Sequence, residues 1–237
     1  MEYYFLSIVI PALNEEKYLP ACLSSLNSQD YPKDKYEVIV VNNDSTDRTA
    51  EIATEMGARV VSCHEKGVAA VRQDGYEQAK GEIFVGTDSD TVQPTDWLSR
   101  INELFQSDPS LIAITGGAEF NSNSLLNQFL AKELFPINLQ IMFALGKQSL
   151  SGFNFSVRRD AFEQVGGFDT SLASAEDVDL GVRLGKIGKV KFIRSLVVTT
   201  SSRRIDASRV KFFTHHLRNV IKFMILGQKP ESFENIR

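Results

Sequence analysis

The sequence is poor in cysteine: its 237 residues include only Cys22 and Cys63. Two cysteines are too few for a disulfide scaffold or a four-cysteine zinc site, so a reducing compartment is expected. The sequence also lacks any uninterrupted apolar run of about 18 residues, the length that a transmembrane helix needs. The N-terminus has no basic region, because Glu2 precedes a short apolar run that meets Pro11, which indicates a strand rather than a signal peptide. These absences predict a cytoplasmic protein.

An excess of positive charge is missing as well. Lysine and arginine number 26 against 30 acidic residues, so the net charge is −4, which argues against a nucleic-acid partner. The charge is unevenly distributed, however. Residues 1–185 carry a net charge of −13, whereas residues 186–230 have 11 basic side chains and only Asp206, a net charge of +10. An acidic body followed by a basic segment indicates that this segment contacts something anionic.

The first part of the chain alternates between short apolar runs and amphipathic segments. Runs typical of strands cover residues 5–10, 36–41, 59–62 and 82–87, and helical spacing covers residues 14–28, 46–56 and 68–79. Strands and helices that alternate with short links predict βαβ units with a parallel sheet. Ligands of such sheets bind beyond the carboxyl ends of the strands. The polar residues expected at this edge are Asn14, Glu15, Asn42, Asn43, Asp44, Asp88 and Asp90.

The regular alternation stops near residue 95. Further strands are expected at residues 112–120, 154–157 and 191–199, with helices at residues 97–105 and 177–184. No repeat, low-complexity tract or linker divides the chain, so we expect a single α/β domain over residues 1–237. Within it, a nucleotide-binding half covers about residues 1–95, and a more variable half covers about residues 96–205.

Asp88-Ser89-Asp90 directly follows one of the apolar runs. Two carboxylates two positions apart in a turn can converge on one divalent cation, and Mg²⁺ and Mn²⁺ prefer oxygen ligands. Such a cation would neutralise the charge on a nucleotide's phosphates. Two solvated aspartates in an ordinary turn are the simpler interpretation, but the position at a strand end favours the metal site.

Glu176-Asp177 forms a second acidic pair, at the expected start of a helix. Acidic side chains at a helix N-terminus compensate the helix dipole. A carboxylate in this pair could also be a general base that takes a proton from an attacking hydroxyl. Lys66 and Arg72 flank the start of an earlier helix, where basic groups either contact phosphate oxygens or line a solvated face.

Taken in order, these segments resemble the family-2 glycosyltransferases, which have the GT-A fold. The resemblance covers about residues 5–200 and rests on the order and spacing of its motifs. The segments are Ser7–Glu15 (SIVIPALNE), Val38–Thr49 (VIVVNNDSTDRT), Gly67–Gly81 (GVAAVRQDGYEQAKG), the DxD motif Asp88-Ser89-Asp90, Ser151–Asn154 (SGFN), Arg158–Asp169 (RRDAFEQVGGFD) and Glu176-Asp177. The implied fold is a Rossmann-like mixed, mostly parallel sheet flanked by helices.

The activity implied by the resemblance is an inverting, metal-dependent transfer of a sugar from a UDP- or GDP-sugar to a hydroxyl acceptor, in envelope polysaccharide or glycolipid synthesis. The acceptor, a saccharide or a lipid-linked group, would meet the second half of the domain. Asp177 would be the base, with Glu176 beside it, and Asp88 and Asp90 would bind Mn²⁺ or Mg²⁺. The residues expected to contact the donor are Pro11, Asn14, Glu15, Asn43, Lys66, Arg72, Asp88 and Ser89.

Two departures from the family pattern leave details open. Asn42-Asn43 stands where many relatives have two aspartates, so uracil and guanine both remain candidate bases. The segment Thr199–Arg204 contains neither the metal-binding histidine of some relatives nor the Gln/Arg-rich acceptor motif of others. Arg203 and Arg204 could instead contact the diphosphate or an anionic acceptor.

The C-terminal segment, residues 206–237, is expected to contain an amphipathic basic helix up to residue 226. It either lies on the anionic inner face of a membrane or packs on the core with a solvated basic face. Two other functions stay open: a polyprenyl-phosphate sugar synthase, and a non-catalytic nucleotide-sugar-binding module. A nicotinamide dehydrogenase is disfavoured because no G-x-G-x-x-G follows the first expected strand.

Overall fold

The computed structural model describes residues 2–122, 124–129, 132–133 and 135–203. Within these residues the strands form one sheet in the order β3-β2-β1-β4-β7-β6-β8-β5. The strands are β1 (Leu6–Ala12), β2 (Tyr36–Asn42), β3 (Arg59–Ser62), β4 (Ile83–Gly86), β5 (Thr91–Val92), β6 (Leu111–Asn121), β7 (Phe155–Arg158) and β8 (Lys189–Ser201). The predicted helix at residues 206–226 lies outside the described residues.

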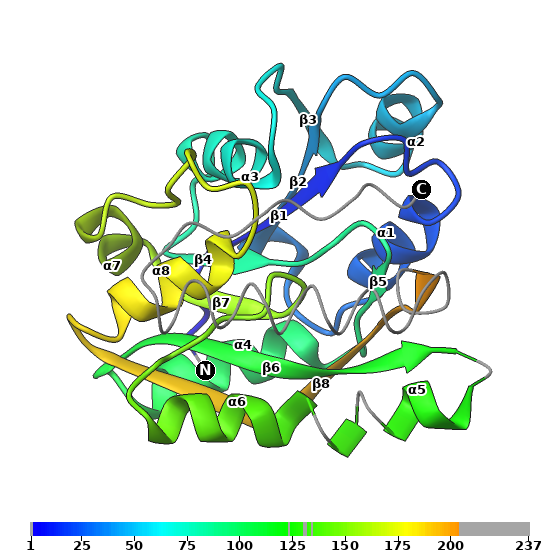
Figure 1. Cartoon of the computed structure of the whole chain (residues 1–237). Helices are drawn as coiled ribbons and strands as arrows, with labels where there is room; N and C mark the ends of the chain where they lie inside the picture. The colour runs from blue at the N-terminus through cyan, green and yellow to red at the C-terminus, as the bar shows by residue number, and fades with distance from the viewer. Residues whose placement is uncertain (1, 123, 130–131, 134, 204–237) are drawn as a thin grey trace.

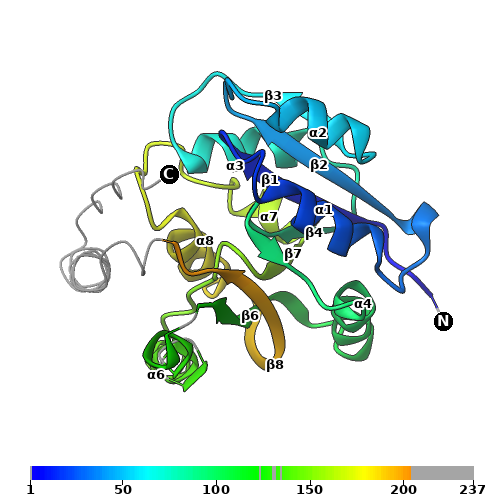
Figure 2. The same ribbon diagram turned by 90° about the vertical axis from the view of Figure 1, so that its right-hand side faces the viewer.

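Helices cover both faces of the sheet (Figures 1 and 2). They are α1 (Leu19–Asn27), α2 (Thr49–Glu55), α3 (Val68–Glu77), α4 (Trp97–Ser107), α5 (Leu125–Phe129), α6 (Phe135–Ala144), α7 (Arg159–Gln164) and α8 (Glu176–Leu184), with a short 3₁₀ turn at Lys33–Lys35. In the described part of the chain, none of these helices is long and apolar enough to cross a membrane.

Strand β1 lies in the sheet interior, between parallel strands β2 and β4. Its side chains alternate between two cores, as the period of a strand requires. Ile8 and Ile10 face a core that includes residues of α1, α2 and α4, whereas Val9 faces one that includes residues of α3, α7 and α8. Because both faces are covered, the strand is apolar along nearly its whole length.

The second half of the sheet is mixed. Strand β7 is antiparallel to both β4 and β6, whereas β8 runs parallel to β6 and antiparallel to the short β5. It follows that β4, β6 and β8 point the same way, so their carboxyl ends lie at one edge with those of β1 and β2. The predicted mixed, mostly parallel sheet flanked by helices is confirmed.

Asn154 fixes the start of β7 against its neighbours. This fully buried side chain accepts a hydrogen bond from Trp97 Nε1 at 3.1 Å and donates two, to the carbonyl oxygens of Gly117 and Leu196, at 2.9 Å each. Buried polar groups require such partners, and a fully satisfied network fixes one arrangement. The Asn154 side chain thereby holds the segment Ser151–Asn154 at the carboxyl edge of the sheet.

Helix α1 begins later than predicted. The apolar spacing indicated a helix from Asn14, but Asn14 has φ +55°, a left-handed conformation that an α-helix excludes. Its side-chain oxygen accepts a hydrogen bond from the Thr46 N–H at 2.8 Å, and its own N–H donates to Ser45 Oγ at 3.0 Å. Residues before α1 therefore form a loop that is tied to the turn after β2.

Candidate active site

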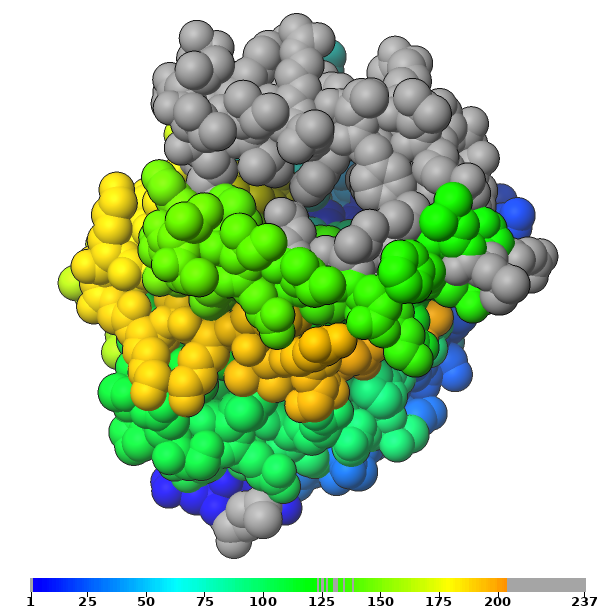
Figure 3. Space-filling model, turned by 60° about the horizontal axis from the view of Figure 1, so that its bottom comes forward, coloured from blue at the N-terminus to red at the C-terminus, as the bar shows by residue number. Residues whose placement is uncertain are grey.

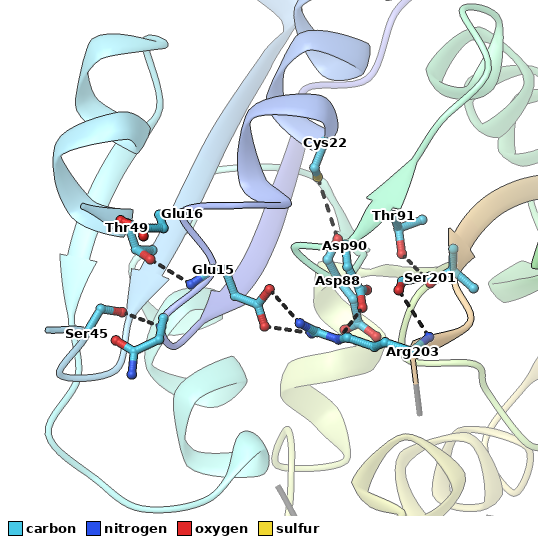
Figure 4. Close-up of polar contacts among 12 residues, drawn as sticks. Glu15, Glu16, Cys22, Ser45, Thr49, Asp88, Asp90, Thr91, Ser201 and Arg203 are labelled. Atoms are coloured by element: carbon cyan, nitrogen blue, oxygen red, sulfur yellow. Dashed lines mark hydrogen bonds and ion pairs between the residues drawn. The ribbon is translucent and has the colours of Figure 1, made fainter. Parts of the chain in front are cut away.

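The polar residues at the carboxyl edge come from loops that follow different strands. Glu15 follows β1, Asp88 and Asp90 follow β4, and Arg203 follows β8 (Figure 4). The Glu15 N–H donates to Thr49 Oγ1 at 2.7 Å, so the β1 loop is held by the N-terminus of α2. Parallel strands bring these loops together, as the position of ligand sites in such sheets predicts.

Arg203 joins the β1 and β4 loops. Its Nη1 and Nη2 donate to the two carboxylate oxygens of Glu15 at 3.0 and 2.6 Å, and its Nε lies 3.1 Å from Asp90 Oδ2. The guanidinium carbon lies 4.8 Å from the centre of the Tyr18 ring. The fork geometry gives two charge-assisted hydrogen bonds to one carboxylate, the strong form of this ion pair. Figure 4 shows the guanidinium between the acidic side chains.

Arg72 forms a second bridge, in the interior. Its side chain is almost completely buried, and its Nη2 donates to Asp88 Oδ1 at 2.6 Å, while its Nε lies 3.4 Å from Glu176 Oε1. The guanidinium carbon also lies 5.9 Å from the centre of the Phe155 ring. A buried guanidinium needs anionic partners to offset its desolvation. Here the partners are one carboxylate from the β4 loop and one from the start of α8.

Glu176 and Asp177 begin α8 after Ala175, which has φ +59°. Asp177 Oδ2 accepts a hydrogen bond from the Gly152 N–H at 2.7 Å, and its Oδ1 accepts one from the Val178 N–H at 2.8 Å. Gly152 is needed here because a Cβ at this position would lie 2.9 Å from Arg72 Nη2 and 3.2 Å from Asp177 Oδ2. The close approach of the loop is what delivers its N–H to the carboxylate.

Both carboxyl groups of this pair bind protons more tightly than free side chains do. Burial raises the pKa of Glu176 to about 7, with a further contribution from the charge of Asp177 and opposition from Arg72. Burial also raises the pKa of Asp177 above its ordinary value, although Arg72 and the Gly152 N–H oppose the shift. Carboxyl groups whose environments raise their pKa are typical of proton-transfer sites.

Asp88 and Asp90 suit a hard divalent cation, because they supply carboxylate oxygens from one turn. In the described residues no group of three or more His, Cys, Asp or Glu side chains is placed to bind a metal ion. A cation bound by these two aspartates would complete its shell with water or phosphate oxygens, as Mg²⁺ does in nucleotide sites. Each aspartate forms an ion pair with an arginine, Asp88 with Arg72 and Asp90 with Arg203. Both carboxylates therefore already have a cationic partner within the protein.

The model of the family "Glycosyl transferase family 2" matches residues 7–166. The chain belongs to this family. Among curated proteins it is 33% identical to glycosyltransferase AglE of Haloferax volcanii over 184 residues, which are 73% of this chain and 59% of AglE. It is 30% identical to a poly(ribitol-phosphate) beta-glucosyltransferase of Bacillus spizizenii, covering 73% of this chain and 28% of that protein. The chain thus matches 59% of the length of AglE and 28% of the length of the Bacillus spizizenii enzyme.

Solved structures of glycosyltransferases share the fold. The mannosyltransferase PcManGT from Pyrobaculum calidifontis, in complex with GDP-Man and Mn²⁺, matches with TM-score 0.73 at 22% identity, over 98% of this chain and 67% of that chain. The glucosyl-3-phosphoglycerate synthase of Mycobacterium tuberculosis, in complex with Mn²⁺ and UDP, matches with TM-score 0.65 at 22% identity, over 97% and 82%. The family 2 chain therefore has the GT-A fold predicted from its motifs.

In this family 2 protein, the residues predicted to act together fall into two connected groups. Glu15 and Asp90 meet through Arg203, and Asp88 and Glu176 meet through Arg72, with Asp177 next to Glu176. The other predicted donor contacts lie nearby: Pro11, near the end of β1, and Asn14, in the loop that follows it, are half-buried. Ser89 is buried in the β4 loop, and Lys66 is exposed in the loop before α3.

Asn43 is partly engaged by the protein. Its side-chain Nδ2 donates to the carbonyl oxygens of Cys63 and Glu65 at 2.8 Å each, so it ties the β2 loop to the β3 loop. An amide that donates through its NH₂ group offers its oxygen as an acceptor for an N–H of a base. Contact between Asn43 and the donor base remains a prediction.

Sequence reasoning did not identify two features of the site in this family 2 protein. Gly152 lies in a segment that the motif comparison includes, but only the fold shows that its N–H reaches Asp177. The pairing of Arg203 with Glu15 joins residues 188 positions apart. The available signal was the arginine itself, which follows the strand predicted at residues 191–199.

Proposed function

We propose that the protein is an inverting, metal-dependent glycosyltransferase that moves a sugar from a UDP- or GDP-sugar to a hydroxyl acceptor. The observation that carries this proposal is the position of Arg72 between Asp88 and Glu176. This contact joins the candidate metal-binding turn, Asp88–Asp90, to the acidic pair Glu176-Asp177, which contains the candidate general base, at one edge of the sheet. Attack at an anomeric carbon requires leaving-group stabilisation on one side and a base on the other.

Each residue of the site has a proposed role. Asp177, whose pKa is raised above its ordinary value by burial, accepts the proton of the attacking hydroxyl. The Gly152 N–H and the start of α8 hold its carboxylate in one orientation. Asp88 and Asp90 would hold Mn²⁺ or Mg²⁺, which when bound would neutralise charge on the leaving diphosphate. Glu15 and Asn43 would contact the nucleotide.

The comparisons support a nucleotide-sugar donor and a cation. PcManGT is described with GDP-Man and Mn²⁺, and the Mycobacterium tuberculosis synthase with UDP and Mn²⁺. The relatives also include a poly(ribitol-phosphate) beta-glucosyltransferase and an enzyme named for a dolichyl-phosphate-linked acceptor from Methanococcus voltae. A role in envelope polysaccharide or glycolipid synthesis fits these acceptors.

Replacing the base tests the reaction type. Asp177→Asn keeps the shape of the side chain but removes the proton acceptor, and we expect kcat to fall by about 10²–10⁴ with little change in donor KM. Asp179→Asn is the matched control, because Asp179 is on the same helix and pairs with Arg183 at 2.6 Å. A phosphate acceptor hardly needs a base, so an unchanged kcat in Asp177→Asn would favour a polyprenyl-phosphate sugar synthase.

The donor can be identified by ligand stabilisation. A ligand that binds only the folded state raises Tm, so UDP- and GDP-sugars with Mn²⁺ can be ranked by thermal shift. We expect one nucleotide series to raise Tm in wild type by several degrees. Asp90→Asn should lose the Mn²⁺-dependent part of that rise. A Tm unaffected by every donor would contradict nucleotide-sugar binding.

We also propose peripheral attachment to an anionic membrane through residues 206–226, which lie outside the described residues. The described surface supplies apolar contacts: Ile137 and Ile141 of α6 and neighbouring Leu145 are 43%, 53% and 68% exposed. Their spacing of four places them on one helix face, and Figure 3 shows α5 and α6, in green, at the surface. Co-sedimentation with anionic vesicles that weakens with salt is expected. Protein that stays in the supernatant at low salt would refute the attachment.

A further inference from the structure

All three nitrogens of the Arg203 guanidinium lie close to the enzyme's own carboxylates. Two of its nitrogens bind Glu15 at 2.6 and 3.0 Å, and the third lies 3.1 Å from Asp90. The three side chains are largely shielded, with exposed fractions of 19% for Arg203, 11% for Glu15 and 12% for Asp90. Shielding strengthens the attraction because water screens these charges less than it screens a surface pair.

Asp90 therefore has two candidate cationic partners. A divalent cation held by Asp88 and Asp90 would approach the carboxylate that Arg203 already contacts at 3.1 Å. Arginine stays charged at all working pH values, so it cannot lose its proton to make room. Like charges at this separation repel, and the guanidinium must either weaken cation binding or leave Asp90.

Diphosphate is a suitable new partner for Arg203. The guanidinium fork binds phosphate oxygens in the same two-pronged manner as it binds Glu15. The Tyr18 ring, 4.8 Å from the guanidinium carbon, supports the flat face of the group while its N–H edge changes partners. Arg72 is less suitable because its side chain is only 2% exposed and is held by Asp88 and Glu176.

We propose that Arg203 is a positioning residue that competes with the divalent cation for Asp90 in the donor-free enzyme and moves to the donor diphosphate when donor and cation bind together. In the donor-free state Arg203 joins the β1 and β4 loops and keeps the affinity of Asp88 and Asp90 for the cation low. Binding of the diphosphate then strengthens cation binding, because it removes the competing charge. This inference rests on the proposed metal site at Asp88 and Asp90.

Direct measurement of Mn²⁺ binding tests the competition. Free Mn²⁺ is measured by electron paramagnetic resonance during titration of wild type and Arg203→Gln, without nucleotide and without catalysis. We expect Arg203→Gln to bind Mn²⁺ about tenfold more tightly, the factor that corresponds to about 1.4 kcal/mol. A gain of affinity cannot result from a folding defect. Arg159→Gln is the charge-matched control, because Arg159 pairs with Glu163 and follows β7 at the opposite edge of the sheet.

A second titration with saturating GDP or UDP tests the transfer to the diphosphate. The nucleotide should tighten Mn²⁺ binding by a larger factor in wild type than in Arg203→Gln, because only wild type releases a competing arginine. Equal Mn²⁺ affinities, or equal nucleotide effects, in the two proteins would overturn this inference and leave the metal site standing. Failure of both proteins to bind Mn²⁺ under any condition would overturn the metal site and this inference together.

Discussion

A methyl group at position 152 is expected to damage catalysis more than stability. The added Cβ of Gly152→Ala would lie 2.9 Å from Arg72 Nη2 and 3.2 Å from Asp177 Oδ2, closer than van der Waals packing allows. Arg72 cannot retreat freely, because it is buried and bound to Asp88 at 2.6 Å. The loop itself must therefore shift by about half an ångström, which lengthens the 2.7 Å hydrogen bond from Gly152 to Asp177.

The magnitude follows from this displacement. A misplacement of about 1 Å at a reacting group can cost about 10²-fold in rate, so a loss of about 10-fold to 100-fold in kcat is expected. Crowding in a packed interior costs about 1–3 kcal/mol, which leaves a domain of ordinary stability folded. The assay compares nucleoside diphosphate release by the variant and wild type, with urea unfolding of both.

Gly117→Ala provides the control for this substitution. A Cβ at Gly117 meets its nearest atoms at 3.8 and 4.0 Å, which is ordinary contact. We expect kcat and the free energy of unfolding to stay close to wild type in this variant. Wild-type kcat in Gly152→Ala, or equal losses in both variants, would refute the assigned role of the Gly152 loop.

Two further substitutions test the electrostatics and the core of the site. The pKa of Glu176 is raised to about 7, so the folded protein binds this proton more tightly than the unfolded chain, and this contribution to stability is lost as pH rises towards and through 7. Glu176→Gln should therefore gain up to about 3 kcal/mol relative to wild type between pH 5 and pH 8 in urea unfolding, and a pH-independent difference would contradict the shift. Asn154→Ala should lower the free energy of unfolding by at least about 3 kcal/mol, because Trp97 Nε1 and two carbonyl oxygens lose their hydrogen-bond partner. A loss under about 1 kcal/mol would show that water replaces the amide.

The first half of the fold was predictable because its signals are local. Apolar runs and helical spacing located β1 to β4 and the helices between them within a few residues. The mixed half was harder, since the insertion of β7 between β4 and β6 depends on contacts between distant segments. Strand β5 has only two residues and no pattern of its own. The late start of α1 reflects the left-handed conformation of Asn14, which apolar spacing does not encode.

The candidate site was predictable as residue types but not as contacts. The carboxylates of Asp88, Asp90 and Asp177 follow from motifs, and the position of Asp88 and Asp90 at the carboxyl edge follows from parallel strands. Their counter-charges do not: the sequence left phosphate contact or a solvated face open for Arg72, and its burial between Asp88 and Glu176 is visible only in the structure. Burial and pairing depend on the packing of elements far apart in the chain, and short motifs carry no information about them.

Metal-dependent turnover of a nucleotide-sugar tests the central claim most directly. Wild type and Asp90→Asn are incubated with UDP- and GDP-sugars, and release of the nucleoside diphosphate is measured with Mn²⁺ and with EDTA. We expect wild type to release the diphosphate from one nucleotide series with Mn²⁺ and to lose this activity with EDTA. Asp90→Asn should lose at least about 10²-fold. Binding of a nucleotide-sugar without any release would indicate a non-catalytic binding module, and release that is unaffected by EDTA or by Asp90→Asn would contradict the assigned metal site.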